Sequence, residues 1–345
     1  MPLRIALLGC GRIARWFHLP LLAAAPGVEL RTVADPDPAA LAFARRASPA
    51  IMAVPDWREA LDGIDAVVVA LPPLLHAEAA CAAFELGCHV YLEKPIGVAE
   101  EEGERVVRAW RASGRVGMMG FNVRFDATVN RLRRAMAQGR VGRAVGMRVA
   151  IGGPGGEPPA WIRSRSSGGG VLLDLGSHVV DLARYLFRVE IDSAVAAVAS
   201  RRWEEDTASI VLRLENGVLA QALVTLAGVQ ESVVEIQGGR GALVADLYAG
   251  TLEVRPAEPP QGRRGHLRHA FLEARSLARH AAGVLWPPDP GASYREALAA
   301  FVRAASGGPF TGADLEDGHR SLVAIAAAER SAHGGREAAW GTEGA

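Results

Sequence analysis

The sequence has few cysteines, no excess charge of either sign and no long apolar run. Its three cysteines, Cys10, Cys81 and Cys88, cannot all pair and show no C-x-x-C spacing, so we expect them to be reduced and buried. The 38 basic and 38 acidic residues cancel, which removes any bulk electrostatic case for a nucleic-acid or membrane partner. No apolar run reaches the ~20 residues that span a bilayer, and the first predicted strand leaves no room for a signal peptide. These absences favour a cytoplasmic protein.

What the sequence does contain is a glycine-rich turn directly after its first apolar run. Gly9, Gly11 and Ala14 form the pattern G-x-G-x-x-A between a predicted strand and a predicted helix. Glycines let the backbone turn tightly and approach a pyrophosphate, and a helix N-terminus directs its N–H groups at the phosphates. Asp35 closes the next predicted strand, roughly 20 residues further on, as the dinucleotide fingerprint requires. We interpret the pattern as a dinucleotide site rather than an ordinary βαβ turn.

Apolar runs and helical patterns alternate through the first third of the chain. This alternation is typical of a doubly wound parallel sheet with helices on both faces. The predicted fold class is therefore α/β. We expect strands at Leu3–Leu8, Val28–Asp35, Ile51–Val54, Ala66–Ala70, His89–Leu92 and Val116–Gly120.

The pattern changes after residue 122. A predicted helix near Thr128 to Gln138 and a strand at Ala144–Ile151 are followed by strands and turns from Ser193 to Val254, with Glu215–Gly217 as a hairpin signal. A chain of 345 residues also favours two domains. We expect a dinucleotide-binding Rossmann domain at 1–122, a substrate-binding and oligomerisation α/β domain with an open, mostly antiparallel sheet at 123–335, and a disordered tail at 336–345.

Two predicted strands in the second domain are apolar on both faces. In Ser209–Leu214 and Val218–Leu226, both alternating sets of side chains are largely apolar. Helices of the same domain would cover one face only, so the other face requires a second cover. We therefore expect a homodimer or homotetramer that associates through the outer face of this sheet.

Further motifs occur in a fixed order along the chain. They are Leu71-Pro-Pro with His76, Glu93-Lys94-Pro95 after a predicted strand, Gly120–Phe125, and Gly168–Gly170 followed by Asp174-Leu-Gly-Ser-His178. Together they resemble the Gfo/Idh/MocA family, the NAD(P)-dependent oxidoreductases related to glucose–fructose oxidoreductase and inositol dehydrogenase. The resemblance covers roughly residues 3–335. It implies a Rossmann domain beside an open-sheet α/β domain, and hydride exchange between nicotinamide and a sugar or cyclitol hydroxyl.

The dinucleotide pattern and the resemblance together predict the cofactor site. His76 is left open between a cofactor contact and a residue that only begins a helix. No arginine directly follows Asp35, whose charge would repel a 2′-phosphate, so we expect NAD rather than NADP. The expected cofactor contacts are Gly9, Gly11, Arg12, Ile13, Asp35, Leu71, Pro72, His76, Glu93 and Lys94.

Three residues are candidates for the chemistry: Lys94, Asp174 and His178. Lys94 lies at the carboxyl end of a predicted parallel strand, where its ammonium can polarise a substrate oxygen. His178 has an unperturbed pKa of ~6.5, which suits a base near neutral pH. Asp174 precedes it by four positions, so its carboxylate can set the imidazole tautomer or bind a substrate hydroxyl. The structural alternatives are a surface lysine, a helix-capping aspartate and an incidental histidine.

The remaining site assignments are weaker. Trp161, Arg163 and Arg124 are candidate substrate contacts, with a structural role equally open for each. The Lys94–Pro95 bond is left open between cis and trans, although trans is the rule for X-Pro bonds. No metal is expected, because the histidines outside the motifs lack ligand spacing. These histidines are His266, His269, His280 and His319.

Three functions remain open. The first is an NAD-dependent sugar or cyclitol dehydrogenase, the second an NAD-dependent glycosidase that oxidises its substrate transiently, and the third a non-catalytic NAD-binding regulator. Between Arg255 and Pro290 no family pattern is visible. An amphipathic stretch there, with Leu267, Phe271 and Leu277 on one face, predicts either a surface helix or a lid over an anionic substrate.

Overall fold

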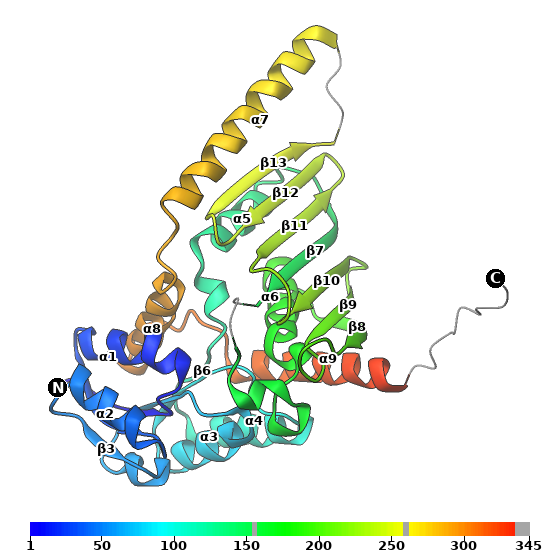
Figure 1. Cartoon of the computed structure of the whole chain (residues 1–345). Helices are drawn as coiled ribbons and strands as arrows, with labels where there is room; N and C mark the ends of the chain where they lie inside the picture. The colour runs from blue at the N-terminus through cyan, green and yellow to red at the C-terminus, as the bar shows by residue number, and fades with distance from the viewer. Residues whose placement is uncertain (154–156, 258–261, 335–345) are drawn as a thin grey trace.

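The structure is a computed structural model that describes residues 1–153, 157–257 and 262–334. Two sheets with their covering helices lie one beside the other, and a long helix runs past the edge of the second sheet (Figure 1). The predicted tail at 336–345 lies outside the described residues. No helix in the described part of the chain is long and apolar enough to cross a membrane.

The first sheet has six parallel strands in the order β3-β2-β1-β4-β5-β6. Its central strands are buried on both faces, which explains their continuous apolar runs. The order reverses between β1 and β4, the switch point beside which ligands bind in open α/β sheets. The predicted doubly wound sheet is confirmed. The strands are β1 Leu3–Leu8, β2 Val28–Ala34, β3 Met52–Val54, β4 Ala66–Val69, β5 His89–Leu92 and β6 Gly117–Met119.

Helices and short turns connect these strands. Asp37 caps the helix after β2 by accepting a hydrogen bond from the N–H of Ala39, and Pro38 occupies its first position. The connecting elements are η1 Ala14–His18, α1 Leu19–Ala24, α2 Pro38–Ala47, η2 Trp57–Leu61, η3 Pro73–Leu75, α3 His76–Glu85 and α4 Glu100–Ser113.

The second sheet has seven strands in the order β13-β12-β11-β7-β10-β9-β8. Only the β7–β10 pair is parallel, so the expected mostly antiparallel sheet is confirmed. The strands are β7 Ala144–Gly152, β8 Ile191–Ala199, β9 Thr207–Leu214, β10 Leu219–Thr225, β11 Ser232–Gly238, β12 Gly241–Asp246 and β13 Thr251–Pro256.

The connections of the second domain carry most of its helices. Asp126 caps α5 by accepting hydrogen bonds from the N–H groups of Thr128 and Val129. The elements are η4 Asn122–Phe125, α5 Ala127–Ala137, η5 Ala160–Arg163, η6 Arg165–Ser167, η7 Leu172–Gly176, α6 Ser177–Phe187, α7 Gly262–Leu285, α8 Ala292–Ala305 and α9 Leu315–Gly334.

Helix α8 returns to the first domain. Phe301 is fully buried, and its ring lies 5.7 Å from that of Tyr91 on β5, in the same apolar cluster as Ile5 and Met118. A division of the chain at residue 122 therefore assigns to the second domain a helix that packs in the core of the first. The segment just before α8 is held at the boundary between the two domains.

One face of the second sheet is buried and the other is open. Along β9 and β10, buried residues alternate with exposed ones. Val211, Leu219 and Leu223 point to the open face and are 37–50% exposed. The large apolar side chains that the sequence predicts for a covered outer face are therefore uncovered in the single chain.

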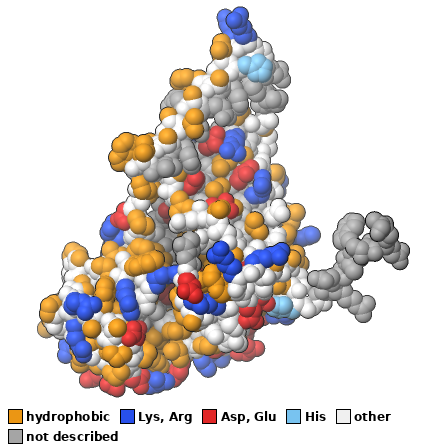
Figure 2. All heavy atoms as spheres, in the orientation of Figure 1, with side chains coloured by type: hydrophobic (Ala, Val, Ile, Leu, Met, Phe, Trp, Pro, Cys, Tyr) orange, Lys and Arg blue, Asp and Glu red, His pale blue; other side chains and the backbone are white. Residues whose placement is uncertain are grey.

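Helix α7 runs alongside β13 at the edge of the second sheet, and apolar side chains follow it in the space-filling view (Figures 1 and 2). Leu267 and Leu277 are 66% and 70% exposed. The lid over an anionic substrate would depend on three arginines that fall mostly on the other face of this stretch, Arg268, Arg275 and Arg279. Their side chains lie outside the described residues. None of the residues of α7 lines the large cavity described below, although the segment that follows it does.

Candidate active site

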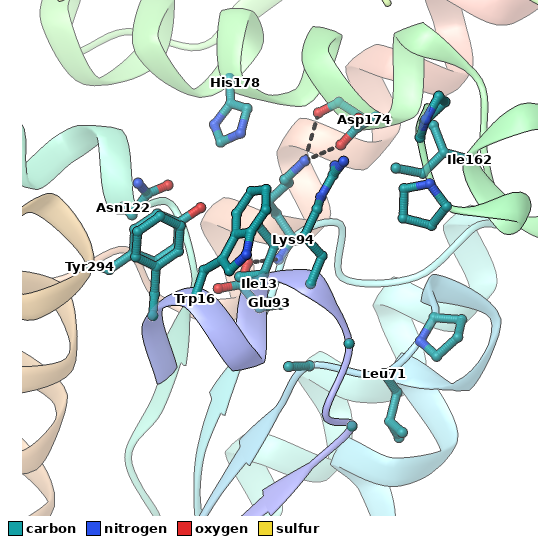
Figure 3. A pocket seen from close by; sticks show the side chains of 18 of the residues that line it. Ile13, Trp16, Leu71, Glu93, Lys94, Asn122, Ile162, Asp174, His178 and Tyr294 are labelled. Carbon is teal, nitrogen blue, oxygen red and sulfur yellow. Dashed lines mark hydrogen bonds and ion pairs between the residues drawn. The ribbon is translucent and has the colours of Figure 1, made fainter. Parts of the chain in front are cut away.

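A cavity of about 1350 Å³ lies between the two domains, at the carboxyl ends of the first sheet. The loops after β1, β2, β4 and β5 form one wall, and η5, η7, α6 and one end of the second sheet form the other. Its volume exceeds the ~300–1,000 Å³ of an ordinary single-ligand pocket, so there is room for a cofactor and a substrate together. Figure 3 shows the side chains that meet in its centre.

The glycine turn fits a dinucleotide. A methyl group on Gly9 would clash with the carbonyl oxygen of Ala70, and Gly9 has a positive φ of 91°, so only glycine is accommodated. At Gly11, by contrast, an added methyl group would have no heavy atom within 4 Å, and the residue lines the cavity. The turn thus leaves open the space that a pyrophosphate needs beside the first N–H groups of the following helical segment.

Asp35 lies at the end of β2 and lines the same cavity. Its Oδ2 accepts a hydrogen bond from the N–H of Cys10 at 2.7 Å, and its Oδ1 accepts one from the N–H of Asp37 at 2.9 Å. Each carboxylate oxygen has a second acceptor position, so ribose hydroxyls can still bind. Folding also brings Arg15 near this site. The guanidinium of Arg15 lies 3.5 Å from the carboxylate of Asp37, and the negative charge of Asp37 offsets the positive charge of Arg15.

Lys94 and Asp174 form an ion pair across the cavity (Figure 3). The Lys94 ammonium donates to the carbonyl oxygen of Asp174 at 3.0 Å and also to its carboxylate. Both side chains are 15% exposed. Burial raises the pKa of the Asp174 carboxyl, but the charge of Lys94 and the hydrogen bond outweigh burial, so the pKa is lowered overall. The Lys94–Pro95 peptide is cis.

Asp174 therefore contacts Lys94 and not the imidazole of His178. Of the two roles that the sequence left open for this carboxylate, a hydrogen bond that sets the histidine tautomer is not formed here, because the carboxylate pairs with the ammonium of Lys94. Binding of a substrate hydroxyl stays open. Asp174 lies in η7, a π-helical turn, and the glycine turn leads into a second one, η1. Such turns are frequent at functional sites.

His178 occupies the first turn of α6 and points into the space bounded by Lys94, Trp16 and Tyr294 (Figure 3). Its Nδ1 is buried and has no hydrogen-bond partner among the described residues. Burial and the positive charge of Lys94 lower its pKa to about 3, with Asp174 opposing them in part. The ring is therefore neutral at pH 7, and it can accept a proton or a hydrogen bond.

Glu93, the residue before Lys94, forms a buried pair with His18. Oε1 of Glu93 lies 2.8 Å from Nε2 of His18, a histidine with no exposed surface. A methyl group on Gly120 would lie 2.9 Å from the Glu93 carboxylate, so the glycine makes room for that side chain. His18 also contacts the ring of Tyr294 edge-on at 5.8 Å.

His76 joins two of the predicted cofactor segments. Its ring nitrogens lie 2.6 Å from the carbonyl oxygen of Pro95 and 2.8 Å from that of Leu71. Burial lowers its pKa. His76 both begins α3 and lines the cavity, so the two interpretations that the sequence left open describe the same residue.

The candidate substrate contacts have different positions. Trp161 lines the cavity from η5. Arg124 does not line it: its Nε lies 3.0 Å from the Asp181 carboxylate and its second anionic contact is Asp317 at 2.9 Å. Arg124 thus belongs to a buried ion-pair network, the structural alternative that the sequence left open. Arg163 pairs with Glu157 at 2.9 Å and is also absent from the lining.

Sequence reasoning missed the aromatic residues beside Lys94. Trp16 and Phe17 come from η1, and Tyr294 from α8 stacks on Phe17 with ring centres 4.3 Å apart. Asn122 lines the cavity and donates a hydrogen bond to Ser293 at 2.9 Å. Trp16 and Phe17 follow the glycine pattern closely enough to have been considered, whereas no local signal marks Tyr294.

The described residues contain no group of three or more His, Cys, Asp or Glu side chains that could hold a metal ion. The other predicted cofactor contacts do lie together. Arg12, Ile13, Leu71, Pro72 and Glu93 all line the cavity with the residues above.

Comparisons with known proteins identify the family of both domains. The model of the oxidoreductase family with an NAD-binding Rossmann fold, GFO/IDH/MocA, matches residues 3–121, and that of the GFO/IDH/MocA C-terminal domain matches residues 129–244. Inositol 2-dehydrogenase 2 of Saccharopolyspora erythraea is 31% identical over 332 residues, which are 94% of this chain and 91% of that protein. Myo-inositol 2-dehydrogenase of Thermotoga maritima is 27% identical over 340 residues, 95% and 96% of the two chains.

Among solved structures, the WlbA dehydrogenase from Bordetella pertussis in complex with NADH and UDP-GlcNAcA superposes with a TM-score of 0.79. It is 27% identical to this chain, and the superposition covers 97% of this chain and 96% of that one.

Proposed function

Because the chain belongs to the Gfo/Idh/MocA oxidoreductase family, we propose that it is an NAD-dependent dehydrogenase for a secondary hydroxyl of a sugar, a cyclitol or a related compound. The observation that carries the proposal is the meeting of Lys94, Asp174 and His178 in the cavity that the glycine turn also lines. A protein that only sensed the dinucleotide would need the turn but not this cluster.

The residues of the first domain would hold the cofactor. The loop at Gly9 and Gly11 would bind the pyrophosphate, and Asp35 would bind the adenosine ribose. Bound NAD⁺ supplies the hydride acceptor. Trp16 and Tyr294 line the cavity where Lys94 lies, and they would restrict the reacting part of the substrate and exclude water.

Lys94 would bind the substrate oxygen and stabilise the negative charge that develops there as hydride leaves the carbon. Asp174 would hold the ammonium in that position, since their contacts fix the end of a long flexible side chain. The neutral imidazole of His178 would take up the hydroxyl proton. In the reverse direction, the same group would return the proton to the alkoxide.

The test is NADH formation with a panel of inositols, aldoses, glycosides and sugar acids, each with NAD and with NADP. Steady NADH formation with at least one alcohol is expected from the wild type, and a loss of turnover on the order of 10²–10³ is expected from Lys94→Met. Turnover of a glycoside without net NADH formation would instead indicate a glycosidase. Tight NAD binding with no reaction across the panel would contradict the dehydrogenase proposal.

A further inference from the structure

The part of the cavity formed by the second domain is mainly apolar beyond the catalytic cluster, with Gln230 and Ser232 as uncharged polar residues in its wall. One end of the second sheet and the turn η5 supply its walls. We call this region the apolar subsite, and its residues are Ile151, Pro159, Trp161, Leu226, Leu247 and Tyr248.

Charge is nearly absent from the same region. The acidic residues that line the cavity after residue 122 already have partners: Asp126 caps α5, Asp174 pairs with Lys94, and Asp289 accepts from Arg295 at 2.6 Å. The cavity-lining cations among the described residues are Arg12, Arg58 and Lys94, and all three belong to the first domain. The second domain thus offers no described cation to the substrate end of the cavity.

This lining disfavours two kinds of substrate. A phosphate or carboxylate group placed in the apolar subsite would lose its hydration without gaining a cationic partner there, because Arg12 and Lys94 lie on the first-domain side of the cavity. A free cyclitol carries hydroxyls all around its ring, and those that faced the apolar subsite would lose hydrogen bonds to water without replacing them.

We propose that the substrate is a neutral sugar that carries an apolar substituent, such as the aryl or alkyl aglycone of a glycoside. The reacting hydroxyl would lie at Lys94 and His178, and the aglycone would pack in the apolar subsite. The cavity volume of about 1350 Å³ leaves room for this additional group beside a dinucleotide and a sugar ring. This inference rests on the proposed function, because it assigns the substrate class of the same site.

The experiment compares methyl and phenyl glycosides in the gluco, galacto and xylo series. Calorimetric titration of the NADH-loaded protein gives the dissociation constant of each glycoside. We expect phenyl glycosides to bind about 10–100-fold more tightly than the matched methyl glycosides in at least one series, because a ring of this size is buried from water. Glucuronate and UDP-glucose should bind more weakly than the matched phenyl glycoside.

Variants locate the effect. Leu247→Ser and Tyr248→Ser should each reduce the phenyl-to-methyl ratio, since each removes apolar wall from the subsite. Leu86→Ser is the matched control, because Leu86 is 64% exposed on the first domain and lies outside the cavity, and it should leave the ratio intact. Tyr248 is 44% exposed, so its variant keeps the test informative if the Leu247 variant fails to fold.

Binding and turnover separate the two proposals. Equal binding of phenyl and methyl glycosides in every series, or tighter binding of UDP-glucose, would overturn the apolar subsite even if NADH is formed. Tight phenyl-glycoside binding without NADH formation from any substrate would overturn the dehydrogenase function and leave the subsite standing.

Discussion

The pKa of His178 makes the sharpest prediction about the chemistry. From its residue type alone, the imidazole should titrate at ~6.5, and alcohol oxidation should fall as the pH drops through that value. Burial and the charge of Lys94 instead lower the pKa to about 3. At pH 5 the ring would be about 3% neutral with the ordinary pKa but about 99% neutral with the lowered one. We therefore expect no loss of kcat/KM from this residue between pH 7 and pH 5.

The lowered pKa of His178 also makes the free energy of unfolding depend on pH. The native state binds the proton less readily than the unfolded chain, so His178 favours unfolding as the pH falls below ~6.5, and this effect stops growing below about 3. At pH 5 the difference amounts to about 2 kcal/mol relative to pH above 7. His178→Asn should remove that part of the pH dependence of the free energy of unfolding, measured by urea titration at pH 5 and pH 7.5.

Two assays decide the matter. The pH profile of kcat/KM for wild type and His178→Asn shows the acid limb, and an NMR titration of the labelled imidazole shows its protonation directly. His178→Asn should oxidise alcohols roughly 10²–10⁴-fold more slowly at every pH if the ring is the proton acceptor. An acid limb near pH 6.5 that disappears in the variant would refute the lowered pKa. Rates near those of the wild type would mean that the base lies elsewhere, with Lys94 as the next candidate.

Four further outcomes are expected. Lys94→Met should lower kcat on the order of 10²–10³ while leaving the NAD dissociation constant within a few-fold, as measured by fluorescence titration. Asp174→Asn should lower kcat by less than Lys94→Met does. The double variant should be no slower than Lys94→Met, because both residues act through the ammonium of Lys94. Additive losses in the double variant would contradict this. NAD should bind more tightly than NADP, and Asp35→Ser should narrow that difference; an unchanged ratio would argue against a ribose contact. Light scattering at micromolar concentration should give a dimer or a larger species, and the charged substitutions Leu219→Lys and Leu223→Lys should disrupt it. A monomeric wild type would contradict association through the open face.

Features that depend on nearby residues could be predicted from the sequence. The turn at Gly9 needs a positive φ, which is a local requirement that glycine meets, so a short motif carries the information. Strands of the first sheet are buried on both faces, and their uninterrupted apolar runs show this directly. Lys94 follows such a strand, and the carboxyl ends of parallel strands meet at one edge of a sheet. Sequence therefore determined the dinucleotide turn, the first sheet and the position of Lys94.

The tertiary structure decided everything that depends on distant partners. Asp174 and His178 are four residues apart, yet the carboxylate pairs with Lys94, a contact across 80 positions of the chain. The same lysine, together with burial, sets the pKa of His178, and neither influence can be read from local spacing. Arg124 is a plausible substrate contact by sequence, but folding places Asp181 beside it. Tyr294 reaches the site only because α8 packs in the core of the first domain. Spacing along the chain fixes which groups are available, but charge pairing and burial, which arise only on folding, fix what each group can do.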